Sequence, residues 1–161
     1  MLYFSFYFAF FKNQFDTYII KKIYNKIKKK HELILVEGAG GLLTPITKTL
    51  VIADLIKSLR LPAIVITRSS LGTINHTLLT LRVAEASNID ILGIIINHLG
   101  PKMGLAEKTC QIYLQKFTHI PILGIFPFVQ EIKRKNTKYL ADLVERYINI
   151  ELLLEHLILK N

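Results

Sequence analysis

The chain has 161 residues, 51% of them hydrophobic, and a formal net charge of +9. This is the length of one domain with enough apolar material for a hydrophobic core, so we expect a single domain over residues 1–161. Cys110 is the only cysteine, which excludes an internal disulfide and a cysteine-based metal site within one chain, and fits a cytoplasmic protein.

The chain begins with the apolar run MLYFSFYFAFF. This run is shorter than the roughly 20 residues of a membrane-spanning helix, and no positively charged segment precedes it as in a signal peptide. We interpret residues 1–14 as an atypical apolar N-terminus that forms a strand or loop, and we expect no membrane partner. A lipid-bound helical tether is the alternative.

The next segment, Phe15–Lys30, predicts an amphipathic helix with Ile19, Ile20, Ile23 and Ile27 on one face. Its other face carries the lysines Lys21, Lys22, Lys26, Lys28, Lys29 and Lys30. These lysines lack the arginines and interleaved aromatic side chains of a nucleic-acid-binding surface. We therefore interpret them as a solvent-exposed face and expect no nucleic-acid partner.

Short apolar runs then predict buried strands at Glu32–Glu37, Pro62–Thr67, Asp90–Asn97 and Pro121–Phe126. Helical periodicity marks the segments Leu50–Leu59, Thr73–Ala86 and Leu105–Phe117. Continuous apolar strands that alternate with helices indicate an α/β fold with a doubly wound, mostly parallel sheet. Such sheets bind ligands beyond the carboxyl ends of their strands, so candidate site residues are sought there.

The first of these strands ends in Glu37 and leads into a glycine-rich loop with Gly38, Gly40 and Gly41. A charge at the end of a buried strand is costly unless it is paired or binds a metal, so Glu37 is a candidate metal ligand or general base. A buried ion pair with a lysine would satisfy the same requirement. The glycines allow backbone N–H groups to approach an anion, although a tight connection is the alternative for this loop.

The second strand leads into RSSLGTINHT, in which Gly72 and Thr73 begin a helix. The first N–H groups of a helix lack internal partners and its dipole favours an anion, so we expect a carboxylate or phosphate here. The alternative is that Thr73 caps the helix while Asn75 and His76 face solvent or neighbouring loops. The other two strand ends carry Asn97, His98, Pro127 and Phe128.

Taken together, VEGAGGLLTPI, ADLIKSLRLPAIVITRSSLGTINHTLLTL, ILGIIIN and IPILGIFPF resemble the dethiobiotin synthetase family over about Phe15 to Ile150. The resemblance implies a P-loop NTPase-like fold and a homodimer. It also implies a ligase reaction that uses ATP and Mg²⁺ to carboxylate 7,8-diaminononanoate with CO₂. Ring closure then gives dethiobiotin, ADP and phosphate.

The resemblance also implies roles for particular residues. Glu37 is implied to be a magnesium ligand, and Asn97 to contact the adenine edge. The implied nucleotide-binding residues are Glu37, Gly38, Ala39, Gly40, Asn97, His98, Pro127, Phe128 and Val129. The substrate carboxylate is implied to bind the backbone of Gly72, Thr73, Ile74 and Asn75.

One part of the family pattern is absent. The family begins with a strand and a G-x-x-x-x-G-K-[ST] phosphate loop, followed by a catalytic lysine and a second magnesium carboxylate. The 161 residues contain no Gly-Lys-Ser or Gly-Lys-Thr triplet, so we assign no catalytic residue. We expect the C-terminal two-thirds of such an enzyme, without its first strand, and the apolar N-terminal run is a candidate to replace that strand. The alternative is a non-catalytic remnant that keeps the substrate-carboxylate site and part of the dimer surface.

Overall fold

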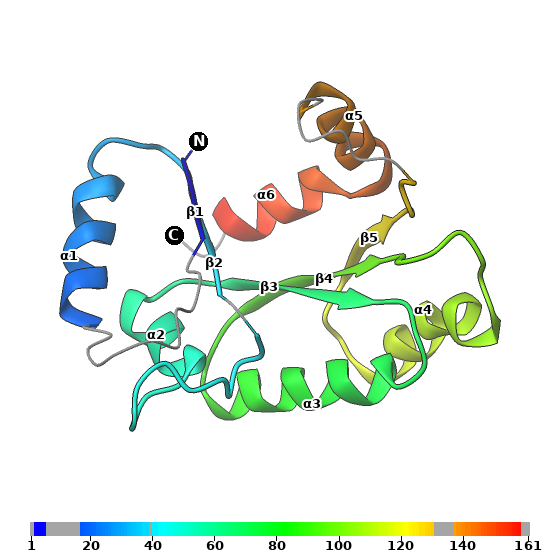
Figure 1. Cartoon of the computed structure of the whole chain (residues 1–161), viewed down its shortest axis with the longest axis horizontal. Coiled ribbons are helices and arrows are strands. Elements are labelled where there is room, and N and C mark those ends of the chain that lie inside the picture. The colour runs from blue at the N-terminus through cyan, green and yellow to red at the C-terminus, as the bar shows by residue number, and fades with distance from the viewer. Residues whose placement is uncertain (1, 6–16, 39, 131–136, 159–161) are drawn as a thin grey trace. The chain divides into compact units, whose positions relative to one another are not determined.

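The computed structural model describes residues 2–5, 17–38, 40–130 and 137–158 (Figure 1). Its strands are β1 Leu2–Ser5, β2 Ile34–Glu37, β3 Ala63–Arg68, β4 Ile91–Asn97 and β5 Ile122–Phe126. Its helices are α1 Thr17–Lys28, α2 Ile52–Leu59, α3 Thr73–Ala86, α4 Leu105–Phe117, α5 Thr137–Tyr147 and α6 Ile150–Ile158. The chain forms two compact units, the first from residues 1–61 and 87–89 and the second from residues 62–86 and 90–161.

The predicted alternation of helices and strands is confirmed. The helices α3 and α4 have the predicted bounds, and the other predicted elements differ by one or two residues at an end. Helix periodicity and continuous apolar runs are strong local signals, whereas element ends depend on cap and turn geometry. Within the described residues, no helix is long and apolar enough to cross a membrane.

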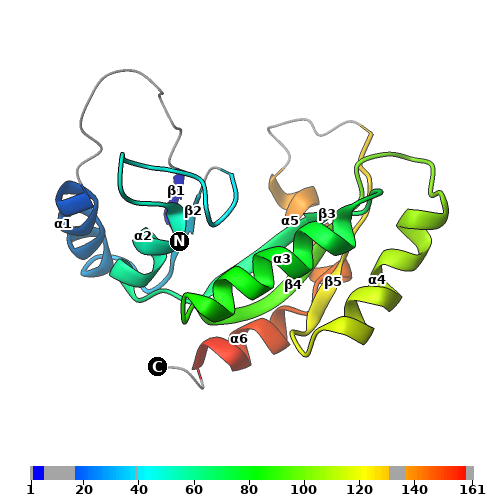
Figure 2. The ribbon, with the colours of Figure 1, turned by 90° about the horizontal axis from the view of Figure 1, so that it is seen from below.

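The second unit contains the parallel sheet β3-β4-β5. Val65 pairs with Ile94 across β3 and β4, and Ile96 pairs with Ile125 across β4 and β5. Figures 1 and 2 show α3 and α4 on one face of this sheet and α6 on the other. The predicted α/β class, with parallel strands covered by helices on both faces, is therefore confirmed for this unit.

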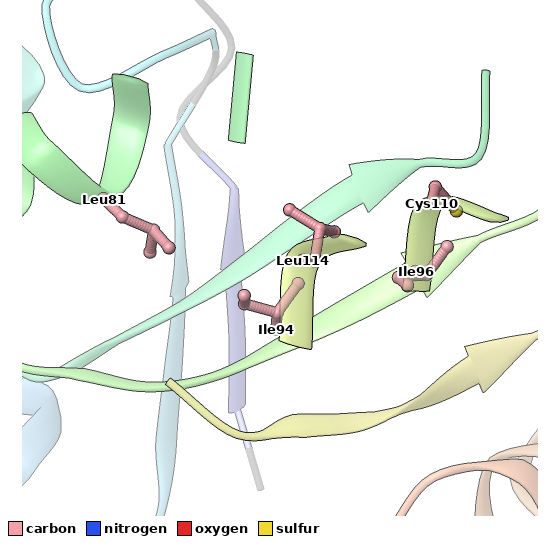
Figure 3. Packing of buried hydrophobic residues seen from close by; sticks show 5 residues of the cluster. All are labelled: Leu81, Ile94, Ile96, Cys110 and Leu114. Carbon is pink, nitrogen blue, oxygen red and sulfur yellow. The ribbon is translucent and has the colours of Figure 1, made fainter. Parts of the chain in front are cut away.

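The core of the second unit lies between β4 and the helices α3 and α4 (Figure 3). Ile94 and Ile96 of β4 are fully buried and pack against Leu114 and Cys110 of α4 and Leu81 of α3. The central strand β4 is covered on both faces, which explains why its sequence is continuously apolar rather than alternating.

The first unit contains a two-stranded parallel sheet in which β1 pairs with β2. The register joins Leu2 to Ile34 and Ser5 to Glu37. Leu2–Ser5 of the apolar N-terminal run therefore supply a parallel neighbour for β2, as the sequence analysis suggested, and the rest of the run lies outside the described residues. The described strands form two sheets, β1-β2 and β3-β4-β5, whereas the sequence alone predicts one sheet.

The prediction that β2 is a fully buried strand is wrong. Ile34 and Val36 line a narrow apolar cavity together with Ile20 of α1 and Leu59 of α2. Leu35 and Glu37 are exposed, since successive side chains of a strand point to opposite faces. Burial of the Glu37 charge therefore gives no argument for a metal or a buried ion pair.

The amphipathic character of α1 is confirmed, but two of the four isoleucines predicted on its apolar face, Ile19 and Ile23, are exposed. Ile20 is buried and Ile27 is half-buried, but Ile19 is 52% exposed and Tyr24 takes its place beside the apolar cavity. The lysines at positions 21, 22, 26, 28, 29 and 30 are all exposed, as predicted.

Two helices after β5 were not predicted. Asn149 begins α6, since its side-chain oxygen accepts a hydrogen bond from the Leu152 N–H (2.9 Å). The turn between α5 and α6 also pairs with β5, because Ile148 bridges Gly124 and the Asn149 N–H donates to the Leu123 carbonyl (2.7 Å). This contact brings α6 against the sheet.

Candidate functional site

The carboxyl ends of β3, β4 and β5 bring together most of the predicted site residues. Because these strands are parallel and adjacent, the segments that follow them lie at one edge of the sheet. The predicted residues at this edge are Gly72, Thr73, Ile74, Asn75, Asn97, His98, Pro127, Phe128 and Val129. Glu37, Gly38 and Gly40 belong to the first unit, and Ala39 lies outside the described residues.

Hydrogen bonds join the three strand ends at this edge. The Ser69 N–H donates to the Asn97 carbonyl (3.1 Å), and the His98 N–H donates to the Phe126 carbonyl (2.9 Å). The Ser69 hydroxyl is also hydrogen-bonded to Nδ1 of His98. These contacts hold the backbone on both sides of Asn97, so the edge is rigidly positioned before any ligand binds.

The N-terminus of α3 follows a tight turn at the end of β3 (Figure 2). Gly72 has φ +87°, a left-handed conformation that favours glycine. The Thr73 N–H donates to the Ser70 carbonyl (3.1 Å) and the His76 N–H to the Gly72 carbonyl (3.1 Å). The N–H groups of Ile74 and Asn75 make no hydrogen bond with any described residue, so both are available to an anion.

Three threonines anchor this helix terminus to β3. The Thr73 hydroxyl donates to the Arg68 carbonyl and lies 2.7 Å from the Thr67 hydroxyl. Thr67 in turn lies 2.8 Å from the hydroxyl of Thr77, and Thr73 and Thr77 are both buried. The alternative that Thr73 caps α3 is therefore wrong, because its side chain bonds the strand instead of the first N–H groups of the helix. Asn75 and His76 are exposed, as that alternative also expected.

The residues predicted to surround a nucleotide base are partly accessible. Asn97 is half-buried between Arg68 and Phe126, its register partners on the neighbouring strands. Pro127 and Val129 are half-buried, and Phe128 is exposed at the end of β5. An amide beside an aromatic side chain offers hydrogen bonds and a stacking surface, which is the chemistry a base requires.

The glycine-rich loop of the first unit is held by local contacts. Gly40 has φ +88°, and a Cβ there would lie 2.5 Å from the Thr44 hydroxyl oxygen. The Ile52 N–H donates to the Thr44 carbonyl (3.0 Å) and the Ala53 N–H to the Leu42 carbonyl (2.9 Å). The first two N–H groups of α2 are therefore already hydrogen-bonded to the loop. The tight-connection explanation therefore accounts for Gly40, and the start of α2 offers no free anion site through these two groups.

The exposed carboxylate of Glu37 lies at the carboxyl end of β2. In the described part of the chain, no group of three or more histidine, cysteine, aspartate or glutamate side chains is arranged to hold a metal ion. Mg²⁺ is commonly held by one or two carboxylates, water and substrate phosphates, and needs no complete protein cage. One accessible carboxylate is compatible with that mode of binding.

Ser69 and Ser70 were missed as site residues. Ser69 is buried and contacts His98, while the Ser70 hydroxyl oxygen is buried without a hydrogen-bond partner among the described residues. Two hydroxyls directly after a buried strand are a usable signal for a strand-end site. Their partners could not be read from the sequence, since Ser69 and His98 are 29 positions apart.

Comparison with known proteins gives a matching family and several similar proteins that share one name. Residues 8–136 match a family described as AAA domain. The chain is similar to an ATP-dependent dethiobiotin synthetase from Bacillus velezensis, with 41% identity over 79% of this chain and 53% of the relative.

Two further ATP-dependent dethiobiotin synthetases are similar. The Bacillus subtilis protein is 37% identical over 81% of this chain and 55% of its own length. The protein from Nitrosopumilus maritimus is 40% identical over 68% of this chain and 47% of its own length. The chain thus spans about half the length of the curated relatives that it matches.

Proposed function

We propose that this chain, which belongs to the AAA domain family and is a dethiobiotin synthetase-like protein, takes part in an ATP-dependent ligation in biotin synthesis. The substrate is 7,8-diaminononanoate, which is carboxylated by CO₂ to a carbamate. ATP phosphorylates the carbamate, and the second amine displaces phosphate to close the ureido ring, which yields dethiobiotin and ADP.

The observation that carries this proposal is the N-terminus of α3. The unpaired N–H groups of Ile74 and Asn75 offer donors to a carboxylate, and the helix dipole adds about 0.3–1 kcal/mol that salt would screen. Gly72 is left-handed and has no side chain of its own, and the His76 imidazole borders it, since a Cβ at Gly72 would lie 3.6 Å from His76 Cε1. We propose that this terminus binds the substrate carboxylate, and that the Thr73 N–H, already bonded to Ser70, contributes less than its neighbours.

The nucleotide base is proposed to lie at the same sheet edge. Asn97 contacts the adenine edge with His98 beside it, and Pro127, Phe128 and Val129 line the base. The resemblance also gives Gly38, Ala39 and Gly40 a proposed role at the phosphates; Gly38 and Gly40 belong to the first unit, and Ala39 lies outside the described residues. Glu37 is proposed to bind Mg²⁺, whose chemistry is to neutralise phosphate charge during transfer. The active form is proposed to be a cytoplasmic homodimer.

A second candidate is a non-catalytic chain that keeps the substrate-carboxylate site and part of the dimer surface. It is favoured by the absence of a Gly-Lys-Ser or Gly-Lys-Thr triplet from the 161 residues. A phosphate loop positions and neutralises the transferred phosphate, so a chain without one is expected to give no dethiobiotin above background. Dethiobiotin formation by the purified chain would rule out this second candidate.

The carboxylate site is tested by NMR titration of the ¹⁵N-labelled chain with 7,8-diaminononanoate. The amides of Gly72, Ile74 and Asn75 should shift most, and 7,8-diaminononane, which lacks the carboxylate, should leave them in place. Gly72→Val should abolish these shifts, because a branched side chain disfavours the left-handed conformation and blocks the approach. His76→Ala removes the imidazole that borders Gly72 but leaves the backbone N–H groups in place, so it should weaken binding less than Gly72→Val does. Unmoved amides at the start of α3 would refute the carboxylate site.

A further inference from the structure

The contact between Ser69 and His98 joins two strand ends at the candidate nucleotide site. Ser69 is only 4% exposed, and its hydroxyl is hydrogen-bonded to Nδ1 of His98. The backbone N–H groups of both residues are also bonded, to Asn97 and Phe126 respectively. Neither residue can therefore move far from the other without breaking the sheet edge.

The chemistry of this contact determines where the imidazole proton resides. A neutral imidazole has one N–H donor and one acceptor nitrogen, whereas a hydroxyl can donate or accept. If Nδ1 donated to Ser69, the hydroxyl proton would need another acceptor, and Ser69 has no other side-chain partner among the described residues. A buried hydroxyl proton without an acceptor is unfavourable, so Ser69 donates and Nδ1 accepts. The proton of the neutral ring then resides on Nε2.

The second nitrogen of His98 is open to a ligand. Nε2 makes no hydrogen bond with a described residue, and the Ser70 hydroxyl is the one buried side-chain polar atom in the described ranges that lacks a partner. Since Nε2 is therefore not buried, water or a ligand can reach it. The Nε2–H group is a hydrogen-bond donor whose orientation is fixed by the contact between Nδ1 and Ser69. His98 directly follows Asn97 in the chain.

We infer that Ser69 is a positioning residue: its hydroxyl fixes the Nε2–H tautomer of His98, so that His98 donates a hydrogen bond to an acceptor atom of the nucleotide base. This inference rests on the proposed nucleotide site at Asn97 and His98. The complementary group is a ring nitrogen or carbonyl oxygen of the base. An exocyclic amine would be rejected at this position, because it would place donor against donor.

The tautomer is measured in the ligand-free 161-residue chain by long-range ¹H–¹⁵N correlation at a pH where His98 is neutral. In the parent, Nδ1 of His98 should resonate well downfield, as an acceptor nitrogen does, and Nε2 at the position of an N–H nitrogen. In Ser69→Ala the two shifts should approach each other as the tautomers mix. Ser70→Ala, which removes the neighbouring hydroxyl, is the matched control and should keep the parent pattern. A protonated Nδ1 in the parent would overturn the inference, and this spectrum decides it even if Ser69→Ala does not fold.

Titration with AMP then tests the ligand. AMP should shift the Nε2 resonance of His98, and Ser69→Ala should weaken AMP binding by about two- to tenfold, the range for loss of one hydrogen bond. The resonances of His31, His119 and His156 serve as internal references. Equal AMP affinity in Ser69→Ala and the parent would overturn the positioning role. An AMP-insensitive His98 in the parent would instead contradict the proposed nucleotide site, while the titration with 7,8-diaminononanoate tests the carboxylate site independently.

Discussion

Cys110 shows how burial changes the chemistry of a single side chain. It is 1% exposed in the core of the second unit, and its thiol contacts the Glu107 carbonyl at 3.4 Å. Burial raises the pKa of the Cys110 thiol above its ordinary value because the thiolate loses solvation, and the charge of Glu107 acts in the same direction. The folded chain therefore keeps the thiol protonated at a pH where the unfolded chain loses the proton.

This difference predicts a pH-dependent stability. Between the unfolded pKa, about 8.5, and the higher folded pKa, the folded state binds more protons, so the free energy of unfolding falls as pH rises. Cys110→Ala should lower the free energy of unfolding by about 1 kcal/mol at neutral pH, and this difference from the parent should shrink as the pH rises above about 8.5. Urea unfolding of both proteins at several pH values measures this. A deficit that does not change with pH would contradict the raised pKa.

The strand β5 and the turn between α5 and α6 lie in close contact because Gly124 has no side chain. A Cβ on Gly124 would lie 2.0 Å from the Tyr147 carbonyl oxygen and 3.0 Å from the Ile148 Cα. Backbone atoms cannot move aside as a flexible side chain can, so only glycine allows this close approach. The approach in turn allows Ile148 to be buried and α6 to pack on β4 and β5.

We therefore expect Gly124→Ala to destabilise the fold by at least about 1–3 kcal/mol, the usual cost of overpacking. Gly100→Ala is the matched control, since a Cβ at Gly100 would meet nothing within 4 Å, and it should change stability by less than about 0.5 kcal/mol. Urea denaturation followed by circular dichroism compares the two variants. Equal midpoints for both variants would show that β5 and the turn can separate without cost.

At the scale of the whole molecule, the residues with predicted nucleotide roles occur in both units. Glu37 and the glycine-rich loop belong to the first, and Asn97, His98 and the start of α3 belong to the second. The 161 residues contain no phosphate loop of the G-x-x-x-x-G-K-[ST] type. Phosphate binding through these residues thus lacks the lysine and the cradle of backbone N–H groups that this loop provides.

The 161-residue chain is therefore expected to bind Mg-ATP no tighter than about millimolar, which corresponds to about 4 kcal/mol. Isothermal titration calorimetry measures this affinity. A co-expressed fragment that carries a phosphate loop should tighten ATP binding and restore dethiobiotin formation if the two parts assemble. Micromolar binding by the chain alone would show that another group, such as a lysine of α1, replaces the missing contacts.

Local patterns in the sequence were enough to predict the order of the elements from α1 to β5 and the α/β class. The apolar run at β4 and the helical spacing of α3 and α4 are short-range signals, because propensity and burial act through neighbours a few positions apart. The glycine at position 72 and the polar strand ends likewise indicated the carboxyl edge of the sheet. The exposed α1 lysines were predicted for the same reason.

The tertiary structure alone decided which distant residues meet. The contact of Ser69 with His98, the threonine cluster at α3 and the approach of Gly124 to Tyr147 all depend on strand register and helix docking. The alternate exposure of Leu35 and Glu37 likewise follows from which surfaces are covered. Such contacts arise from packing between segments far apart in the chain, and a local sequence pattern carries no information about them.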